Sequence, residues 1–216
     1  GAGDLLCFLL FLRVLVFPLA RALSMDLPSP SYKSVAWTSL AMGWLSWIVL
    51  IFWLRHVTFV GMLMFAGMMG TFFMLWALGA AWMSRRFVSE DKRWEGLLFA
   101  LGSAALWVVL EHVRSWFLTG FPWLPLAASQ ANRPVMLQGA TVFGQWGISF
   151  MLVLFNVGVA AYMIRIIAWA REKKKSYCPE FYVGLGTMVA MSFLMTRMST
   201  GQKTEALFHA GVIQPL

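Results

Sequence analysis

The stretch LWVVLEHVRSWFLTGFPWLPLAASQ, residues 106–130, combines an apolar helix with the turn that ends it. The helix is expected to stop near Gly120 and Pro122, because glycine tolerates backbone angles that other residues resist and proline has no N–H to continue a helix. Amphipathic aromatic rings are typical of the boundary between lipid tails and water, and three surround this break: Trp116, Phe121 and Trp123. The stretch therefore predicts a helix that leaves a bilayer into a surface loop.

The composition of the chain indicates a membrane protein. Hydrophobic residues make up 60% and charged residues 12% of its 216 residues, whereas charged residues approach a quarter of an ordinary soluble domain. A bilayer core of about 30 Å takes about 20 apolar residues per helix. Six runs meet or approach that length: 5–23, 35–54, 59–83, 97–118, 141–169 and 181–198. We predict an all-α membrane protein, a polytopic bundle of six transmembrane helices within residues 1–198.

The distribution of charge predicts an orientation and argues against nucleic-acid binding, although the net charge is +8. Most of the 17 lysine and arginine residues fall in loops on one side of the predicted membrane, at 21–34, at 84–95 and from the end of the fifth helix to 180. An excess of basic residues marks cytoplasmic loops, so the long loop after Leu118 and the C-terminal tail are expected in the periplasm. The run REKKK at 171–175 could recruit anionic lipid headgroups, although an orientation signal alone explains it.

The C-terminal residues are expected to form a polar connector followed by a β-strand. A polar connector, STGQKTE, follows Met198, and ALFHAGVIQ after it has the apolar pattern of a strand. Because a lone strand cannot form the backbone hydrogen bonds of its two edges, we predict that residues 199–216 are a connector and the first strand of a truncated periplasmic domain.

Cys7 and Cys178 should not form a disulfide bond with each other. Neither has a base next to it in sequence, so neither is a good candidate for a catalytic thiol.

Several of these motifs resemble the bacterial apolipoprotein N-acyltransferases. The match is densest over ALWVVLEHVRSWFLTGFPWLPLAASQ and continues into FGQWGISFMLVLFN. Upstream it includes Gly43 and the segment WLRHVT, and downstream HAGVIQPL resembles the first strand of the nitrilase-like domain of that family. The resemblance covers the chain from about Val35 to its end. The sequence departs from the usual family pattern, with consequences for the shape of the outer loop, at Ser115, Ala127, Ala128 and Pro215.

The resemblance implies a two-step acyl transfer at the outer face of the inner membrane. A phospholipid would donate an acyl chain to a cysteine thiolate, and the amino group of a lipid-modified apolipoprotein would then take the chain from the thioester. In the family, a Glu, a Lys and a Cys of the nitrilase-like domain carry this chemistry, and all would lie beyond Leu216. We therefore assign no catalytic residue, cofactor or metal site to this chain, and expect it to be inactive alone. The expected partners are the phospholipid donor, the apolipoprotein acceptor and the bilayer.

The candidate site residues surround the predicted helix end, and several have two readings. Glu111 and Arg114, three residues apart on one helix, could pair with each other, or Arg114 could contact a phosphate headgroup. The turn at 120–123 could simply end the helix and anchor it at the interface, or it could shape a portal for lipid. The many methionines could fill gaps between helices or line an acyl-chain groove. The lipid-facing candidates are Glu111, Arg114, Trp116, Thr119, Gly120, Phe121, Pro122, Trp123, Ser129 and Gln130.

Two other classes of protein remain as alternatives. A transporter is expected to carry paired charges or broken helices near the middle of the membrane, whereas only Arg13 places a charge at the centre of a predicted span. A non-catalytic membrane scaffold that holds a partner is the second alternative.

Overall fold

The computed structural model describes residues 31–87, 94–117, 120–131, 136, 139–172 and 177–200. Within these residues the chain is all helical, and five of the six predicted helices form. The helical elements are α2 (Tyr32–Leu50), η1 (Phe52–His56), α3 (Phe59–Phe87), α4 (Glu95–Trp116), η3 (Leu126–Gln130), α6 (Ala140–Glu172) and α7 (Pro179–Thr200). The predicted helix at 5–23 and the predicted strand near the C-terminus lie outside the described residues.

Several predicted boundaries differ from the structure; α3, for example, continues to Phe87, four residues past the predicted end at 83. The run at 35–54 is two elements, because α2 ends at Leu50 and the chain tightens into the 3-10 helix η1. There the N–H of Leu54 donates to the carbonyl of Ile51 at 2.8 Å, the i to i+3 pattern of a 3-10 turn. At the other end of the chain, α7 continues to Thr200, two residues past the boundary expected after 198.

Three of the described helices are long and apolar enough to cross a membrane: α3 over Phe59–Arg86, α4 over Glu95–Trp116 and α6 over Ala140–Ile167. They support a membrane protein, while the full set of six spans stays a prediction. The exposed surface fits this class, since large apolar side chains such as Trp37, Val57 and Met64 are each more than 70% exposed. Apolar exposure of this kind suits contact with lipid rather than water.

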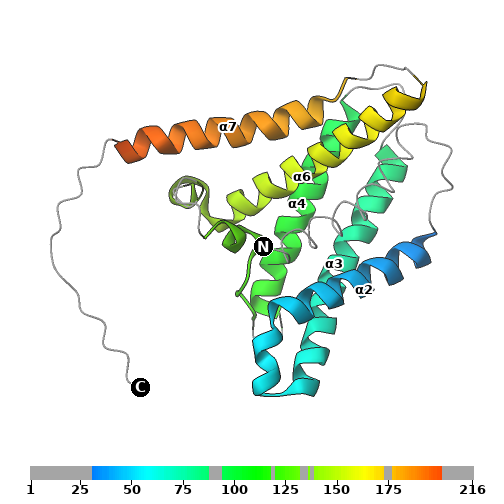
Figure 1. Ribbon diagram of the computed structural model, residues 1–216, viewed down its shortest axis with the longest axis vertical. Helices are drawn as coiled ribbons and strands as arrows, with labels where there is room; N and C mark the ends of the chain where they lie inside the picture. Colours follow the sequence, from blue (N-terminus) through cyan, green and yellow to red (C-terminus); the bar gives the residue numbers. More distant parts are fainter. Residues whose placement is uncertain are drawn as a thin grey trace.

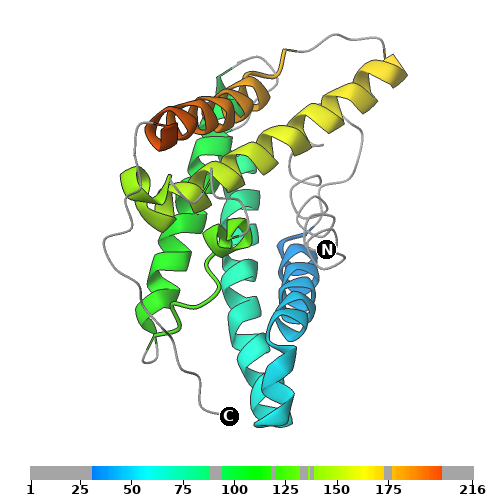
Figure 2. The ribbon, with the colours of Figure 1, turned by 60° about the vertical axis from the view of Figure 1, so that its left-hand side comes forward.

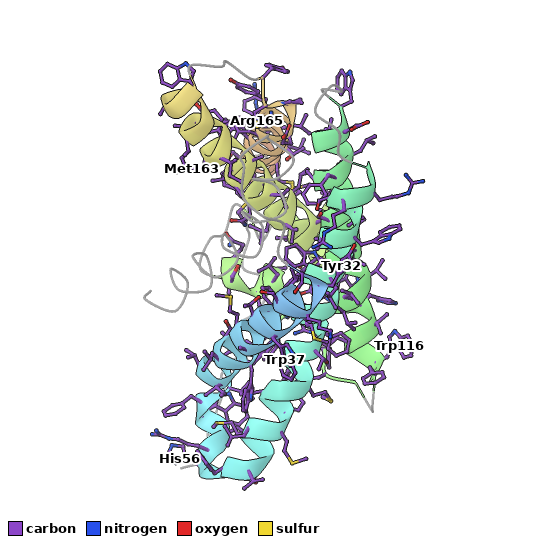
Figure 3. All side chains as sticks on the ribbon, turned by 90° about the vertical axis from the view of Figure 1, so that its right-hand side faces the viewer. Tyr32, Trp37, His56, Trp116, Met163 and Arg165 are labelled. Carbon is purple, nitrogen blue, oxygen red and sulfur yellow. The ribbon has the colours of Figure 1, made fainter. Side chains whose placement is uncertain are left out.

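The helices pack in chain order, each against its neighbour in sequence: α2 on α3, α3 on α4, α4 on α6 and α6 on α7. Figure 1 shows the tip of the α2–α3 hairpin at one end of the long axis and α7 lying across the other, and Figure 2 shows the same separation. From the hairpin tip α3 runs towards the end that α7 crosses, and α4 runs back towards the tip (Figure 1). In Figure 3 His56 lies at the hairpin tip and Arg165 towards the opposite end.

Small residues and one large aromatic residue set the packing of the bundle. A Cβ at Gly70 would lie 2.9 Å from the backbone nitrogen of Trp44, so α2 and α3 approach each other at a distance that only glycine permits. Ala66, four residues earlier on α3, is fully buried. Between α3 and α4, the indole N–H of the buried Trp76 donates to the carbonyl of Ser103 at 2.9 Å.

A buried ion pair joins α6 to α7 at the end away from the hairpin tip. Arg165 Nη2 lies 2.7 Å from Glu180 Oε1, and Glu180 is fully buried. Arg165 also donates to the carbonyl of Tyr177, just before α7. Tyr162 and Phe181 stack beside the pair with ring centroids 4.4 Å apart. This cluster fixes the start of α7 against α6.

Candidate functional site

The helix break predicted from the sequence forms at the end of α4. Gly120 has a φ of 85°, in the left-handed region, and a Cβ there would collide with the carbonyl oxygen of Ser115. The N–H of Gly120 donates to the carbonyl of Phe117 at 3.0 Å, and that of Phe121 donates to the carbonyl of Arg114 at 3.2 Å. The chain therefore folds back over the last turn of α4. Thr119 lies outside the described residues.

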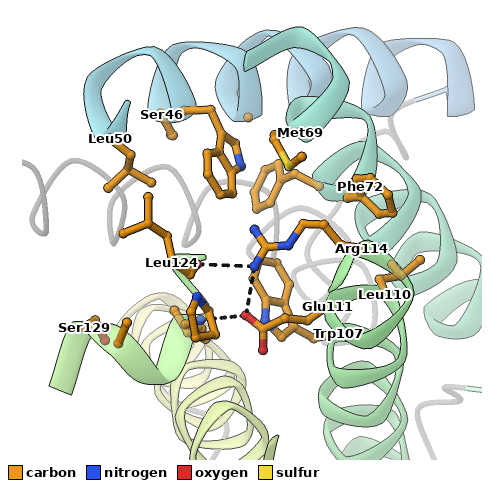
Figure 4. Close-up of a pocket in the computed structure, with 16 residues that line it drawn as sticks. Ser46, Leu50, Met69, Phe72, Trp107, Leu110, Glu111, Arg114, Leu124 and Ser129 are labelled. Carbon is orange, nitrogen blue, oxygen red and sulfur yellow. Dashed lines mark hydrogen bonds and ion pairs between the residues drawn. The ribbon is translucent and has the colours of Figure 1, made fainter. Parts of the chain in front are cut away.

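Glu111 and Arg114 pair with each other, as one of the two readings of the sequence predicted. Arg114 Nη2 lies 3.7 Å from Glu111 Oε1, and both side chains are buried. The pair also holds the loop that follows: Glu111 Oε1 accepts from the backbone N–H of Leu126 at 2.6 Å, and Arg114 Nη2 donates to the carbonyl of Leu124 at 3.3 Å. Figure 4 shows these contacts converging between α4 and the loop. We call this arrangement the Glu111–Arg114 clamp.

The clamp surrounds a backbone position that is unfavourable on its own. Leu124 has a φ of 53°, in the left-handed region that residues other than glycine seldom adopt. Such a conformation costs about 1–3 kcal/mol and persists only where the surroundings enforce it. Here Arg114 binds the carbonyl of Leu124 itself, and Glu111 binds the N–H of Leu126 two residues later. The clamp therefore holds the loop in its shape.

The aromatic residues of the turn divide into an inward and an outward group. Phe121 packs edge-on against Phe65 of α3, with ring centroids 4.5 Å apart, and near Trp47 of α2 at 6.1 Å. The guanidinium of Arg114 lies over the same Trp47 ring, 5.0 Å from its centroid. By contrast, Trp116 and Trp123 are about 60% exposed, and Pro122 is exposed too. The turn thus contacts the α2–α3 hairpin with one side and presents two tryptophans on the other.

A cavity of about 320 Å³ lies beside the clamp, between α2, α3, α4 and η3. Its apolar wall includes Leu50, Met69, Phe72 and Leu110, and its polar groups include Ser46, Glu111, Arg114 and Ser129. Three predicted site residues, Glu111, Arg114 and Ser129, therefore line one space. The other described candidates, Trp116, Gly120, Phe121, Pro122, Trp123 and Gln130, lie around it without lining it. Gln130 instead donates to Ser129 Oγ at 3.0 Å.

Sequence reasoning missed the cavity residues on other helices, such as Ser46 and Trp47 on α2. Their neighbours along the chain are apolar helix residues without a motif. Only the fold brings them to the site, where Trp47 contacts Arg114 of α4 and Phe121 of the turn. Met69 was covered only by a general prediction for the methionines, which could either fill gaps between helices or line an acyl-chain groove. The structure places Met69 in the wall of the cavity.

The departures from the family pattern at Ala127 and Ala128 fit the observed loop. Ala127 is buried, its N–H donates to Ser149 Oγ at 3.2 Å, and it packs with Ile148 and Leu152 of α6. Ala128 lines the cavity. The loop therefore rests on α6 on one side and bounds the cavity on the other. Among the described residues, no cluster of three His, Cys, Asp or Glu side chains could hold a metal ion.

The hydrogen bonding of the Glu111–Arg114 clamp is incomplete. Glu111 Oε2 and Arg114 Nε are buried and have no hydrogen-bond partner among the described residues. Buried polar groups in native proteins nearly always have a partner, and each exception asks for a reason. The clamp thus uses one oxygen and one nitrogen for the loop and leaves another of each unmatched.

These features define a class: a helical membrane protein with a mainly apolar cavity, lined on one side by a clamped loop, at one end of a spanning helix. Residues 5–158 match the family model described as the Apolipoprotein N-acyltransferase N-terminal domain, and the chain belongs to this family.

Similar proteins carry the same family name. The Apolipoprotein N-acyltransferase of Shewanella oneidensis is 30% identical over 175 residues, which cover 74% of this chain and 32% of that protein. Its namesake in Pseudomonas syringae pv. tomato is 43% identical over 94 residues, 43% of this chain and 17% of that protein. The one from Azotobacter vinelandii is 45% identical over 75 residues, 34% of this chain and 14% of that protein. The chain thus spans about a third or less of these relatives.

Proposed function

We propose that this chain is the membrane part of an acyltransferase of the bacterial inner membrane. The enzyme would move an acyl chain from a phospholipid, through a thioester on the enzyme, to the N-terminal amino group of a diacylglyceryl-cysteine apolipoprotein. The reacting Glu, Lys and Cys would belong to a nitrilase-like domain beyond residue 216. The helices of this chain would bring the two lipid-anchored reactants together, since orienting reactants lowers the barrier to their reaction.

The cavity beside the Glu111–Arg114 clamp is the observation that carries this proposal. Both proposed reactants bear hydrocarbon chains, and the cavity offers an apolar wall with a few polar groups at one end, the usual form of a site for such ligands. It lies at the end of α4, beside the loop assigned to the periplasmic side by the charge distribution. The exposed Trp116 and Trp123 suit the membrane interface at this level.

The test is complementation. The gene that encodes this chain, in its full natural length, is expressed in bacteria depleted of their own apolipoprotein N-acyltransferase. Mass spectrometry of lipoprotein N-termini then measures the fraction that is triacylated. The proposal expects triacylated lipoproteins to return, and their continued absence despite normal expression would contradict it. A non-catalytic scaffold would give the latter result.

A further inference from the structure

We propose that the tip of the α2–α3 hairpin, residues 52–64, binds the phosphate group of a phospholipid through Arg55. The proposed function requires a phospholipid donor, and this inference deepens it by giving the headgroup of that donor a place on the protein. The role as a donor site rests on the proposed function. The binding itself can be measured without any acyl transfer.

Large apolar side chains cover the outside of the hairpin tip. The residues that are at least 47% exposed are Phe52, Trp53, Val57, Phe59, Val60 and Met64. The backbone beneath them is well fixed, because Ile51 and Met62 are buried and the carbonyl of Leu54 accepts the N–H groups of two later residues, both at 3.0 Å. An apolar surface of this extent marks a contact with a membrane or with another molecule.

The hairpin tip extends past the hydrocarbon boundary that the exposed tryptophans of the turn after α4 indicate. Phe121 of that turn contacts Phe65, six residues along α3 from its start at Phe59. At 1.5 Å per residue α3 continues about 9 Å beyond this contact, and both ribbon views show the tip beyond the end of α4 (Figures 1 and 2). A headgroup layer adds about 5–8 Å on each side of the hydrocarbon core. The tip therefore lies at the level of lipid headgroups.

Arg55 places a positive charge at this level. Its side chain is exposed, its Nε donates to His56 Nε2 at 3.3 Å, and its guanidinium lies over the ring of Phe52, 4.0 Å from the centroid. An imidazole that accepts at Nε2 is neutral, so these contacts orient the guanidinium without a negative charge among the described residues. The planar fork of a guanidinium suits the oxygens of a phosphate. A phosphate is therefore the complementary group at this depth.

Arg55 is better placed for a phosphate than Arg114, for which the sequence left this contact open. Arg114 is buried and lies 3.7 Å from the Glu111 carboxylate. A phosphate beside it would also meet that carboxylate, and like charges at short range repel. The exposed Arg55 has neither restriction.

The position of the tip also connects a bound phospholipid with the cavity. Leu50, the last residue of α2 before η1, lines the cavity and is 46% exposed. The cavity wall therefore reaches the protein surface next to the tip. A phospholipid whose phosphate is held by Arg55 would keep its acyl chains close to this wall.

The test identifies the lipid beside the tip in the full-length natural protein. p-Benzoylphenylalanine replaces Trp53, which is 55% exposed, or Leu45, which is 57% exposed within the apolar part of α2. The protein is purified in an uncharged maltoside detergent and irradiated with one added lipid at equal low mole fraction. The lipids are dioleoylphosphatidylglycerol, dioleoylphosphatidylcholine and dioleoylglycerol, which has no phosphate. Mass spectrometry measures the fraction of protein that carries each lipid.

Both phospholipids should form adducts from position 53 about fivefold more than dioleoylglycerol, which corresponds to about 1 kcal/mol, the upper value for one exposed ionic contact. Position 45 should show no such preference. A higher yield with phosphatidylglycerol than with phosphatidylcholine would add the net charge of the lipid to the recognition, and equal yields would assign it to the phosphate alone; both support the proposal. Equal yields with all three lipids at position 53 would overturn it. Crosslinks from position 53 to residues beyond 216 in place of lipid would overturn it too.

The variant Arg55→Gln tests the assignment to the guanidinium. Loss of the charge-assisted hydrogen bonds should lower the ratio of phospholipid to dioleoylglycerol adducts at position 53 to about one. Arg86→Gln, the same change at an exposed arginine near the other end of α3, is the control and should leave the ratio unchanged. An unchanged ratio in a folded Arg55→Gln variant would refute the proposal, and if this variant does not fold, the ratios with Arg55 present still decide. Failure of complementation would leave these ratios intact, so the two proposals fail separately.

Discussion

Arg114 connects three parts of the protein through one side chain. It pairs with Glu111 on its own helix, donates to the carbonyl of Leu124 in the loop, and lies over the ring of Trp47 on α2. Its backbone carbonyl also accepts the N–H of Phe121. Because these contacts reach both the loop and the α2–α3 hairpin, the shape of the cavity depends on the end of α4.

At the residue scale, Gly120→Ala is expected to displace the turn and destabilise the protein. A methyl group would collide with the Ser115 carbonyl, and the φ of 85° is unfavourable for alanine. The expected cost is about 1–3 kcal/mol, measured as a lower unfolding midpoint in detergent. Gly186→Ala is the matched control, because its added methyl group would meet no atom within 4 Å and alanine favours a helix. Equal midpoints for the two variants would refute the role given to Gly120.

A second prediction at this scale concerns the thiol of Cys178. Burial, followed by the nearby charge of Glu180, raises the pKa of Cys178 from 9.0 to about 11. The folded protein therefore keeps the thiol proton while an unfolded chain loses it, so this group leaves stability unchanged at neutral pH and lowers it as the pH rises from 9 towards 11. In a Cys7→Ser background, the rate of iodoacetamide labelling of the folded protein should keep rising beyond about pH 10, because the thiolate is the reactive form. A rate that levels off by about pH 10, as expected for the ordinary thiol of unfolded protein, would contradict the assignment.

The Glu111–Arg114 clamp shows which contacts can be predicted from residue types and their spacing. The spacing of Glu111 and Arg114 made their pairing one of two readings, because residues three apart are neighbours on a helix. Their contacts with Leu124 and Leu126 use backbone groups, which every residue has, so no side-chain pattern marks them. The positive φ of Leu124 could not be predicted from the sequence either, because leucine rarely adopts such a conformation.

At the scale of elements, apolar runs located the helices well because a helix in lipid needs few polar residues along its length. The end of α2 was misplaced for the same reason: the residues of η1 begin with Phe52, Trp53 and Leu54, which continue the apolar pattern. The close approach of α2 and α3 at Gly70 depends on how these two helices meet, whereas α6 bends at Gly144 through a φ of 63°. Hydropathy along the chain reports neither feature.

The junction of α6 and α7 gives a prediction for an element. Glu180→Gln removes the negative charge that pairs with Arg165 and leaves a buried cation with a weaker partner. Breaking one side of a buried pair costs about 3 kcal/mol or somewhat more, so the unfolding midpoint should fall clearly. The start of α7 should also become more sensitive to protease. Glu95→Gln serves as the comparison, and a Glu180→Gln variant as stable as that control would show that the pair contributes little.

At the scale of the whole molecule, the bundle places the hairpin tip and the end of α4 away from the α6–α7 junction (Figure 1). The distribution of lysine and arginine predicts that the first of these ends faces the periplasm. Single cysteines at His56 and Trp94, in a background without Cys7 and Cys178, test this arrangement. A membrane-impermeant maleimide should label His56→Cys in intact spheroplasts and Trp94→Cys only after the membrane is opened. The reverse pattern would invert the topology.

The central claim is that the turn after α4 meets the lipid-modified protein on the periplasmic side. The most direct measurement places p-benzoylphenylalanine at Trp123, which is 61% exposed, or at Trp94, which is 69% exposed near the other end of α4. The full-length natural protein carrying either change is expressed in cells depleted of their own acyltransferase and irradiated. The account predicts adducts with diacylated lipoprotein from position 123 and none from position 94. Adducts from position 94, or none from position 123 while lipoproteins become triacylated, would contradict it.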